Sequence, residues 1–175
     1  MASNPHAPFM PKLMILDDDR AFCREMADFF RSFGFLPKFC DNPALAQRKA
    51  LLAHPDIVLL DLHMPGFDSL AIGQAIKRQQ PWVQLIYTVT NADAALAEKA
   101  LASGGESILF KPFRNMHIVY QTVRQSAATV KAWQESMLRN LKTSFPGEYE
   151  TIFGPSQDVG PHDDMLEAFF STDAE

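Results

Sequence analysis

The chain alternates short apolar runs with amphipathic stretches, and this alternation constrains its fold more than any other feature. Each run is followed by a stretch whose apolar residues recur every three or four positions, as in a helix that covers a core. Parallel strands need such long crossovers, and the crossovers are right-handed. The sequence therefore predicts an α/β fold with a doubly wound, five-stranded parallel sheet. The expected strands are 13–16, 35–40, 57–60, 83–89 and 107–110.

Residues that begin and end helices support this division. Gly34 follows the first helical stretch, Pro43 opens the second, and Asp93 precedes the fourth, which ends at residues 103–105. Pro37 lies near the start of the second apolar run, and proline favours an edge strand because it lacks a backbone donor. We therefore expect the second strand at an edge of the sheet.

Charged residues follow three of the five expected strands. Asp17 and Asp18 come after the first strand, Asp61 ends the third, and Lys111 ends the fifth. In an open parallel sheet, ligands bind outside the carboxyl ends of the strands, where the strand order reverses. We therefore expect these four side chains to lie near one another.

The residue types at this edge indicate phosphoryl chemistry. Clustered carboxylates repel one another unless a cation compensates, and carboxylate oxygens suit Mg²⁺. A lysine adds a point charge that can hold a phosphate or an aspartate. A lone Asp at a strand end is more often a solvated loop or helix-cap residue, and any one of the four could be that. Together they favour a functional site, because burying several carboxylates at one edge costs stability.

Composition and charge limit the function classes. The net charge is -5 and the pI is near 5.5, so nothing attracts nucleic acid or an anionic membrane over long range. No run approaches the roughly 18 apolar residues of a membrane span, and the start of the chain is not a secretory signal. We expect a cytoplasmic protein without a nucleic-acid or membrane partner. Its two cysteines, Cys23 and Cys40, are expected to be buried and reduced.

Three segments in this order resemble the response-regulator receiver family of two-component signalling. They are Ile-Leu-Asp-Asp-Asp at 15–19, Leu-Leu-Asp-Leu-His-Met-Pro-Gly-Phe-Asp at 59–68, and Leu-Phe-Lys-Pro-Phe at 109–113. The resemblance extends over about residues 12–124. It implies the flavodoxin-like strand order 2-1-3-4-5 and a cis bond between Lys111 and Pro112.

The resemblance also implies a role for each residue of the edge. Asp61 would be the phosphoacceptor, taking a phosphoryl group from a sensor histidine kinase or a histidine phosphotransfer protein. Mg²⁺ would be held by Asp17, Asp18, Asp61 and the backbone carbonyl of His63, and Lys111 would bind the phosphoryl group. The His63 side chain would lie over the phosphoryl group or face solvent as a loop residue. Such a module is not an enzyme, since it catalyses only its own phosphorylation and dephosphorylation.

Two positions depart from the family pattern. Counting back from Lys111, the switch Ser or Thr of the family is replaced by Val89, which cannot donate a hydrogen bond. A shift of one residue would place Thr88 or Thr90 there, and Thr90 is our choice because a bulge can re-aim a strand end. The aromatic switch residue is replaced by Ile108, which we interpret as a core strand residue.

A long helical pattern follows the fifth strand. Its apolar seam continues to about residue 141, with Ser126 as a polar member, and predicts a packing surface for a protein partner or a homodimer through helix 114–141. We expect a disordered lead at 1–11, a receiver domain at 12–125, a helical extension at 126–142 and an acidic, partly disordered tail at 143–175. The seam residues are Met116, Val119, Val123, Val130, Trp133 and Met137.

Two functions remain open at this point. The first is a phosphorylated receiver that signals through protein contacts of its C-terminal helix. The second is a pseudo-receiver that acts as a constitutive interaction module. A phosphatase is disfavoured because it would need a second acid where His63 stands, and nucleotide binding is disfavoured because no Gly-rich phosphate loop is present. The downstream partner and any effector domain are not indicated by the sequence.

Overall fold

A computed structural model of the chain describes residues 9–90 and 93–153. Its strands and helices alternate from β1 to α5, and a short helix, α6, follows α5. The elements are β1 (Lys12–Leu16), α1 (Arg20–Ser32), β2 (Leu36–Cys40), α2 (Pro43–Ala53), β3 (Ile57–Asp61), α3 (Ser69–Gln79), β4 (Gln84–Thr90), α4 (Ala94–Ala102), β5 (Ser107–Lys111), α5 (Met116–Ser144) and α6 (Pro146–Phe153).

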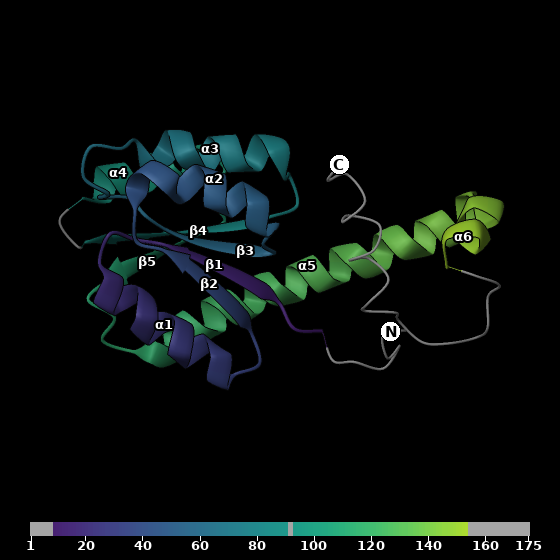
Figure 1. Ribbon diagram of the computed structural model, residues 1–175, viewed down its shortest axis with the longest axis horizontal. Helices are drawn as coiled ribbons and strands as arrows, with labels where there is room; N and C mark the ends of the chain where they lie inside the picture. Colours follow the sequence, from purple (N-terminus) through teal and green to yellow (C-terminus); the bar gives the residue numbers. More distant parts are fainter. Residues whose placement is uncertain (1–8, 91–92, 154–175) are drawn as a thin grey trace. The chain divides into compact units, whose positions relative to one another are not determined.

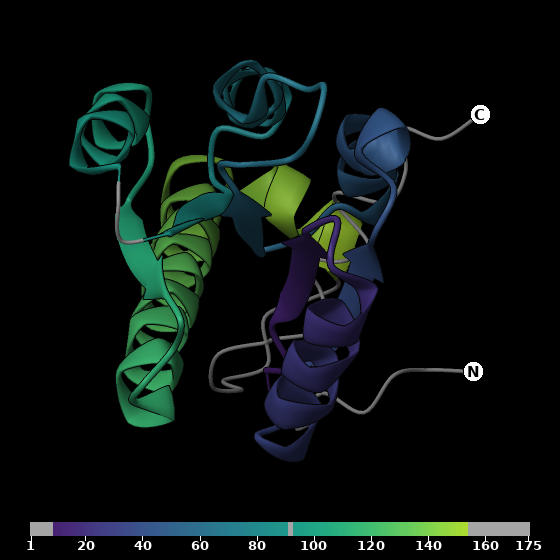
Figure 2. The same ribbon diagram turned by 90° about the vertical axis from the view of Figure 1, so that its left-hand side faces the viewer.

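The strands form one parallel sheet in the order β2-β1-β3-β4-β5. Helices α2, α3 and α4 cover one face, and α1 and the first half of α5 cover the other (Figures 1 and 2). The predicted fold class and strand order are confirmed, and β2 with Pro37 lies at an edge. The strand order reverses between β1 and β3, so the carboxyl ends of these two strands flank the crevice where a ligand would bind.

Local sequence explains where the helices begin. The side chains of Asp19, Asn42, Asp68 and Asp93 each accept a hydrogen bond from a backbone N–H in the first turn of the helix that follows. Helix α3 therefore begins at Ser69 rather than at Phe67, where the apolar pattern begins. The central strand β3 is buried along its whole length, as its uninterrupted apolar sequence predicts.

The chain divides into two compact units, one of residues 10–130 and one to which residues 9 and 131–153 belong. Helix α5 is continuous from Met116 to Ser144, and within the first unit its core side chains are Val119, Val123, Ala127 and Val130. The expected tail at 143–175 holds two short apolar clusters, at 149–153 and at 165–170. The first is part of α6 in the second unit, where Tyr149 is buried. The second cluster and most of the expected lead lie outside the described residues.

No helix among the residues described here is both long enough and apolar enough to span a membrane.

The largest fully buried side chain is Tyr87 in β4, and two glycines make room for it. A Cβ atom added at Gly73 in α3 would meet the Tyr87 hydroxyl and would lie 2.8 Å from Leu85 Cδ2. A Cβ atom at Gly105 would lie 2.7 Å from Tyr87 Cδ2 and 2.9 Å from the Ala100 carbonyl oxygen. Packing on the face covered by α2, α3 and α4 therefore requires glycine at both positions.

This packing predicts that Tyr87→Phe restores stability to Gly73→Ala but not to Gly105→Ala. Gly73→Ala should lower the free energy of unfolding by about 1–3 kcal/mol, because the new methyl group overpacks the face. Tyr87→Phe removes the hydroxyl and should restore part of that loss. Gly105→Ala should not be rescued, since its contacts are with ring carbons and backbone. Urea unfolding of the single and double variants measures this, and equal rescue at both glycines would contradict it.

Candidate functional site

Three carboxylates meet at the carboxyl edge of the sheet. Asp17 follows β1, Asp61 is the last residue of β3, and Asp18 stands one residue before the N-cap of α1. One carboxylate oxygen from each of the three lies within 4.8 Å of the others. Asp17 and Asp61 are buried, whereas Asp18 is exposed, so fewer charges are buried than the sequence suggested. Oxygen donors in this arrangement fit a hard cation such as Mg²⁺.

Lys111 at the end of β5 places its ammonium among these carboxylates. Its Nζ atom lies 2.5 Å from Asp17 Oδ2 and 3.4 Å from Asp61 Oδ1. The peptide bond from Lys111 to Pro112 is cis. The four charged residues that the sequence assigned to one edge thus cluster there, and Lys111 contacts Asp17 and Asp61.

The charges at the edge are strongly coupled. Burial raises the pKa of the Asp17 carboxyl, and its hydrogen bond with Lys111 opposes that shift. The Asp19 backbone N–H also donates to Asp17 Oδ1 at 3.0 Å. Asp17 therefore depends on Lys111 for most of the compensation of its negative charge.

Cys23 in α1 borders this edge as an unreactive thiol. Its Sγ atom donates to the Asp17 carbonyl oxygen at 3.4 Å, and burial raises the pKa of the thiol to about 12. Cys40 is also buried, and both cysteines are free. A thiol held protonated in this way is a packing residue and not a nucleophile.

The end of β4 explains the altered switch position. Thr88 pairs with Asp61 across the sheet, and its Oγ1 atom lies 3.5 Å from Asp61 Oδ1. Val89 is fully buried, and because successive side chains alternate it faces away from the carboxylates. The Thr90 side chain again lies on the side of Asp61 and is exposed. In the strand register, Thr90 stands opposite Lys111 of β5. Two hydroxyls therefore lie on the side of the carboxylates, one beside Asp61 and one beside Lys111.

Ile108 does not replace the missing aromatic residue. It is partly buried, packs against the core cluster and pairs with Tyr87 in the adjacent strand. The large aromatic side chain on this face is Tyr87 itself, fixed between α3 and the turn before β5.

His63 lies at the rim, two residues after Asp61. Its side chain is exposed, and its Nε2 atom lies 3.8 Å from Asp93 Oδ2 at the N-cap of α4. The loop after β3 and the start of α4 thus approach each other through these two side chains.

A cavity of about 660 Å³ opens beside the lysine. The Phe22 ring of α1 forms part of its wall, and Lys111 Nζ lies 4.4 Å from the centre of that ring. Phe22 also packs against Phe113, with ring centres 5.6 Å apart. The lining residues are Phe22, Glu25, Met26, Thr90, Lys111, Pro112, Phe113 and Met116.

Sequence reasoning missed the contacts of Thr88 and Phe22. Phe22 reads as one of several apolar residues of an amphipathic helix. The sequence offers Thr88 only as an alternative to Thr90 for the switch hydroxyl, and not as a contact of Asp61. Asp19 carried a usable signal, because an Asp directly before a helical pattern predicts an N-cap.

Comparison with known proteins places the fold and site in context. The family model named response regulator receiver domain matches residues 13–123 of the chain. The chain is 26% identical over 124 residues to protein RcaC of Microchaete diplosiphon, covering 70% of this chain and 19% of RcaC. It is 29% identical over 124 residues to the sensor histidine kinase RcsC of Escherichia coli K12, covering 71% of this chain and 13% of the kinase. The chain therefore matches only a small part of these relatives.

Solved structures show the same fold. Chemotaxis protein CheY4 of Vibrio cholerae superimposes with a TM-score of 0.61 at 20% identity, covering 67% of this chain and 98% of that chain. A CheY-like receiver domain protein of Methanospirillum hungatei gives a TM-score of 0.65 at 15% identity, covering 70% and 98%. With the family model spanning most of the sheet, its carboxylates and its lysine, the chain belongs to the response regulator receiver domain family of two-component signalling.

Proposed function

We propose that this chain is a receiver that accepts a phosphoryl group on Asp61 from a sensor histidine kinase or a histidine phosphotransfer protein. One observation carries the proposal: Lys111 Nζ contacts both Asp17 and Asp61 at an edge where three carboxylates offer oxygens within 4.8 Å. No structural role needs so much buried charge at the end of a sheet. The family membership supports the same reading.

The proposed transfer uses positioning and charge neutralisation. A carboxylate oxygen of Asp61 forms a bond to phosphorus while the bond from phosphorus to the donor imidazole nitrogen breaks. The nitrogen freed from phosphorus keeps the bonding electron pair, so the imidazole leaves as a neutral molecule when its other nitrogen carries a proton. Lys111 would hold an oxygen of the transferred group by its positive charge.

Mg²⁺ fits the donor set of this edge. Asp17, Asp18 and Asp61 would hold it together with the backbone carbonyl of His63, and it would neutralise phosphoryl oxygens. Asp17 is now shared with Lys111, so metal binding and the lysine position are coupled.

The hydroxyl that contacts the phosphoryl group is proposed to be that of Thr90. Thr88 already lies against the Asp61 carboxylate, whereas Thr90 lies on the same side further along the strand, opposite Lys111. A phosphoryl group on Asp61 would extend beyond the strand end toward Lys111. Thr88 would then keep the Asp61 carboxylate in place.

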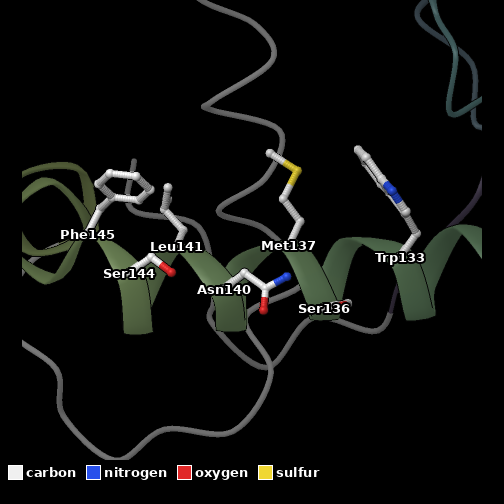
Figure 3. A pocket seen from close by; sticks show the side chains of 7 residues that line it. All are labelled: Trp133, Ser136, Met137, Asn140, Leu141, Ser144 and Phe145. Atoms are coloured by element: carbon white, nitrogen blue, oxygen red, sulfur yellow. The ribbon is translucent and has the colours of Figure 1, made fainter.

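Output is proposed to pass through the second half of α5 rather than through an aromatic switch. Residues 133–145 line an apolar groove of about 350 Å³, and none of the lining residues that the structure describes is charged. Trp133, Met137 and Leu141 project to the same side of the helix (Figure 3). Residues of the first half of α5 pack in the receiver core. A movement of this half would be carried to the second half, because the backbone hydrogen bonds of the helix join the two.

The groove is proposed to bind a protein partner or a second copy of the chain. Asn140 lies within it, and an amide can pair with its own copy because it both donates and accepts. We retain the proposed division into a receiver at 12–125, an extension at 126–142 and a tail at 143–175, and a cytoplasmic location.

A pseudo-receiver is the second candidate, favoured by Val89 and Ile108 at the switch positions. It would keep the groove as a constitutive interaction surface without accepting phosphate.

Phosphorylation separates the two candidates. With Mg²⁺ and acetyl phosphate, the wild-type chain should gain the mass of one phosphoryl group, and Asp61→Asn should gain none because the nucleophilic oxygen is altered. Intact mass spectrometry measures the adduct, and thermal unfolding with beryllofluoride provides a second readout. A wild-type chain with neither adduct nor stabilisation would establish the pseudo-receiver.

Two threonine variants test the switch hydroxyl. Thr90→Val should weaken beryllofluoride binding about tenfold, since one hydrogen bond to a charged group is lost. Thr88→Val should leave that affinity within about threefold, because its hydroxyl contacts the carboxylate and not the added group. Titration followed by thermal shift gives both values. The opposite ranking would assign the role to Thr88.

A charged residue in the groove tests the output surface. Met137→Glu should abolish any self-association that phosphorylation induces, because it buries an unpaired charge in an apolar interface. Arg139→Glu, at an exposed position that does not line the groove, is the control and should associate like wild type. Sedimentation velocity with and without beryllofluoride measures the association. Unchanged association of Met137→Glu would remove the groove as the dimer surface.

A further inference from the structure

Phe22 contacts the lysine of the site although it has no polar group. Lys111 Nζ lies 4.4 Å from the centre of its ring, within the range of a cation–π interaction. The same Nζ atom lies 2.5 Å from Asp17 Oδ2 and 3.4 Å from Asp61 Oδ1. The ammonium is thus held between two carboxylates and the ring.

The ring itself is firmly placed. The Phe22 backbone N–H donates to Asp19 Oδ1 at 3.1 Å in the first turn of α1. The ring packs against Phe113, which follows the cis peptide bond after Lys111. Phe22 therefore stays in position when the lysine moves.

The Asp17 carboxylate is claimed by two cations. Lys111 contacts it in this structure, and the proposed Mg²⁺ site would use it as a ligand. A dication at Asp17 repels the ammonium and takes up the charge that held it. The cavity beside Phe22 provides room for the ammonium to move away from Asp17.

We propose that Phe22 is a positioning residue that holds the Lys111 ammonium beside Asp61 when a divalent cation occupies Asp17. This inference rests on the proposed Mg²⁺ site. A contact raises metal affinity only if it is stronger in the metal-bound state. The ring meets that condition because an ammonium repelled from Asp17 gains contact with the ring, whose centre already lies 4.4 Å from Nζ. Phe22 then acts on the metal only through Lys111.

A double-mutant cycle on Mg²⁺ affinity tests the proposal. Phe22→Leu, which keeps an apolar side chain, should bind Mg²⁺ about threefold more weakly than wild type. In the Lys111→Met background, the same change should have no effect, since the cation is gone. Phe22→Trp should bind at least as tightly as wild type, because indole is the strongest cation–π partner. Isothermal titration of the full chain with MgCl₂ gives the four affinities of the cycle.

Two controls separate this contact from other causes. Among the described residues that line the cavity, Glu25 is the other charged one, and Glu25→Gln should leave Phe22→Leu with the same threefold effect. Because Lys111→Met leaves Asp17 without its cation and could unfold the chain, NMR provides a second measurement. On addition of Mg²⁺, the Lys111 Cε protons of wild type should shift upfield over the ring face, and those of Phe22→Leu should not.

The outcomes distinguish the inference from the function on which it rests. Wild type that binds no Mg²⁺, or binds it equally well as Asp18→Asn, would reject the metal site itself. Wild type that binds through Asp18 while Phe22→Leu binds equally or more tightly would reject the role of Phe22. An equal loss in the wild-type and Lys111→Met backgrounds would also reject it, since it would mean that the ring only supports the fold of the site.

Discussion

The contact of Lys111 with Asp17 and Asp61 is the interaction on which the site depends. Two buried carboxylates at one edge of a sheet would repel each other and would lose hydration. One ammonium, at 2.5 Å from the first and 3.4 Å from the second, compensates both charges. The fold makes this compensation available by ending β1, β3 and β5 at the same edge. Removing the lysine would leave two buried carboxylates that a bound cation or a proton would have to compensate.

The same contact connects chemistry with movement. A divalent cation bound at Asp17 would displace the ammonium that shares this carboxylate, and the Phe22 ring, 4.4 Å from Nζ, is proposed to limit where it goes. The other face of the sheet is built differently. There Tyr87 fills the space under α3 and α4, and two glycines accept its ring, so this face is closely packed. Ile108 of β5 is smaller than the aromatic residue that it replaces, so a change in its rotamer would displace few atoms on this face. This favours an output that passes through α5 instead.

The sequence predicted the fold and the meeting of four charged residues at one edge of the sheet. Apolar runs that stop at Asp17, Asp61 and Lys111 indicate both a strand and the residue at its end, because buried parallel strands have no polar residue until they leave the core. The edge position of β2 followed from Pro37 in the same way. Cap residues predicted the starts of α2 and α4, whereas the apolar pattern of α3 did not indicate where that helix begins. Asp68, and not the first apolar residue, determines the first turn of α3.

What the sequence determined by itself is therefore the order of elements, the strand ends and the type of charge at each. Only the tertiary structure decided which side chains face each other across strands. The register of β4 placed Thr88 beside Asp61, turned Val89 into the core and returned Thr90 toward Lys111. The packing of α1 set Phe22 over the ammonium. The physical reason is that side-chain alternation reverses with a shift of one residue, and hydrophobic patterns do not fix a register to that accuracy at a strand end.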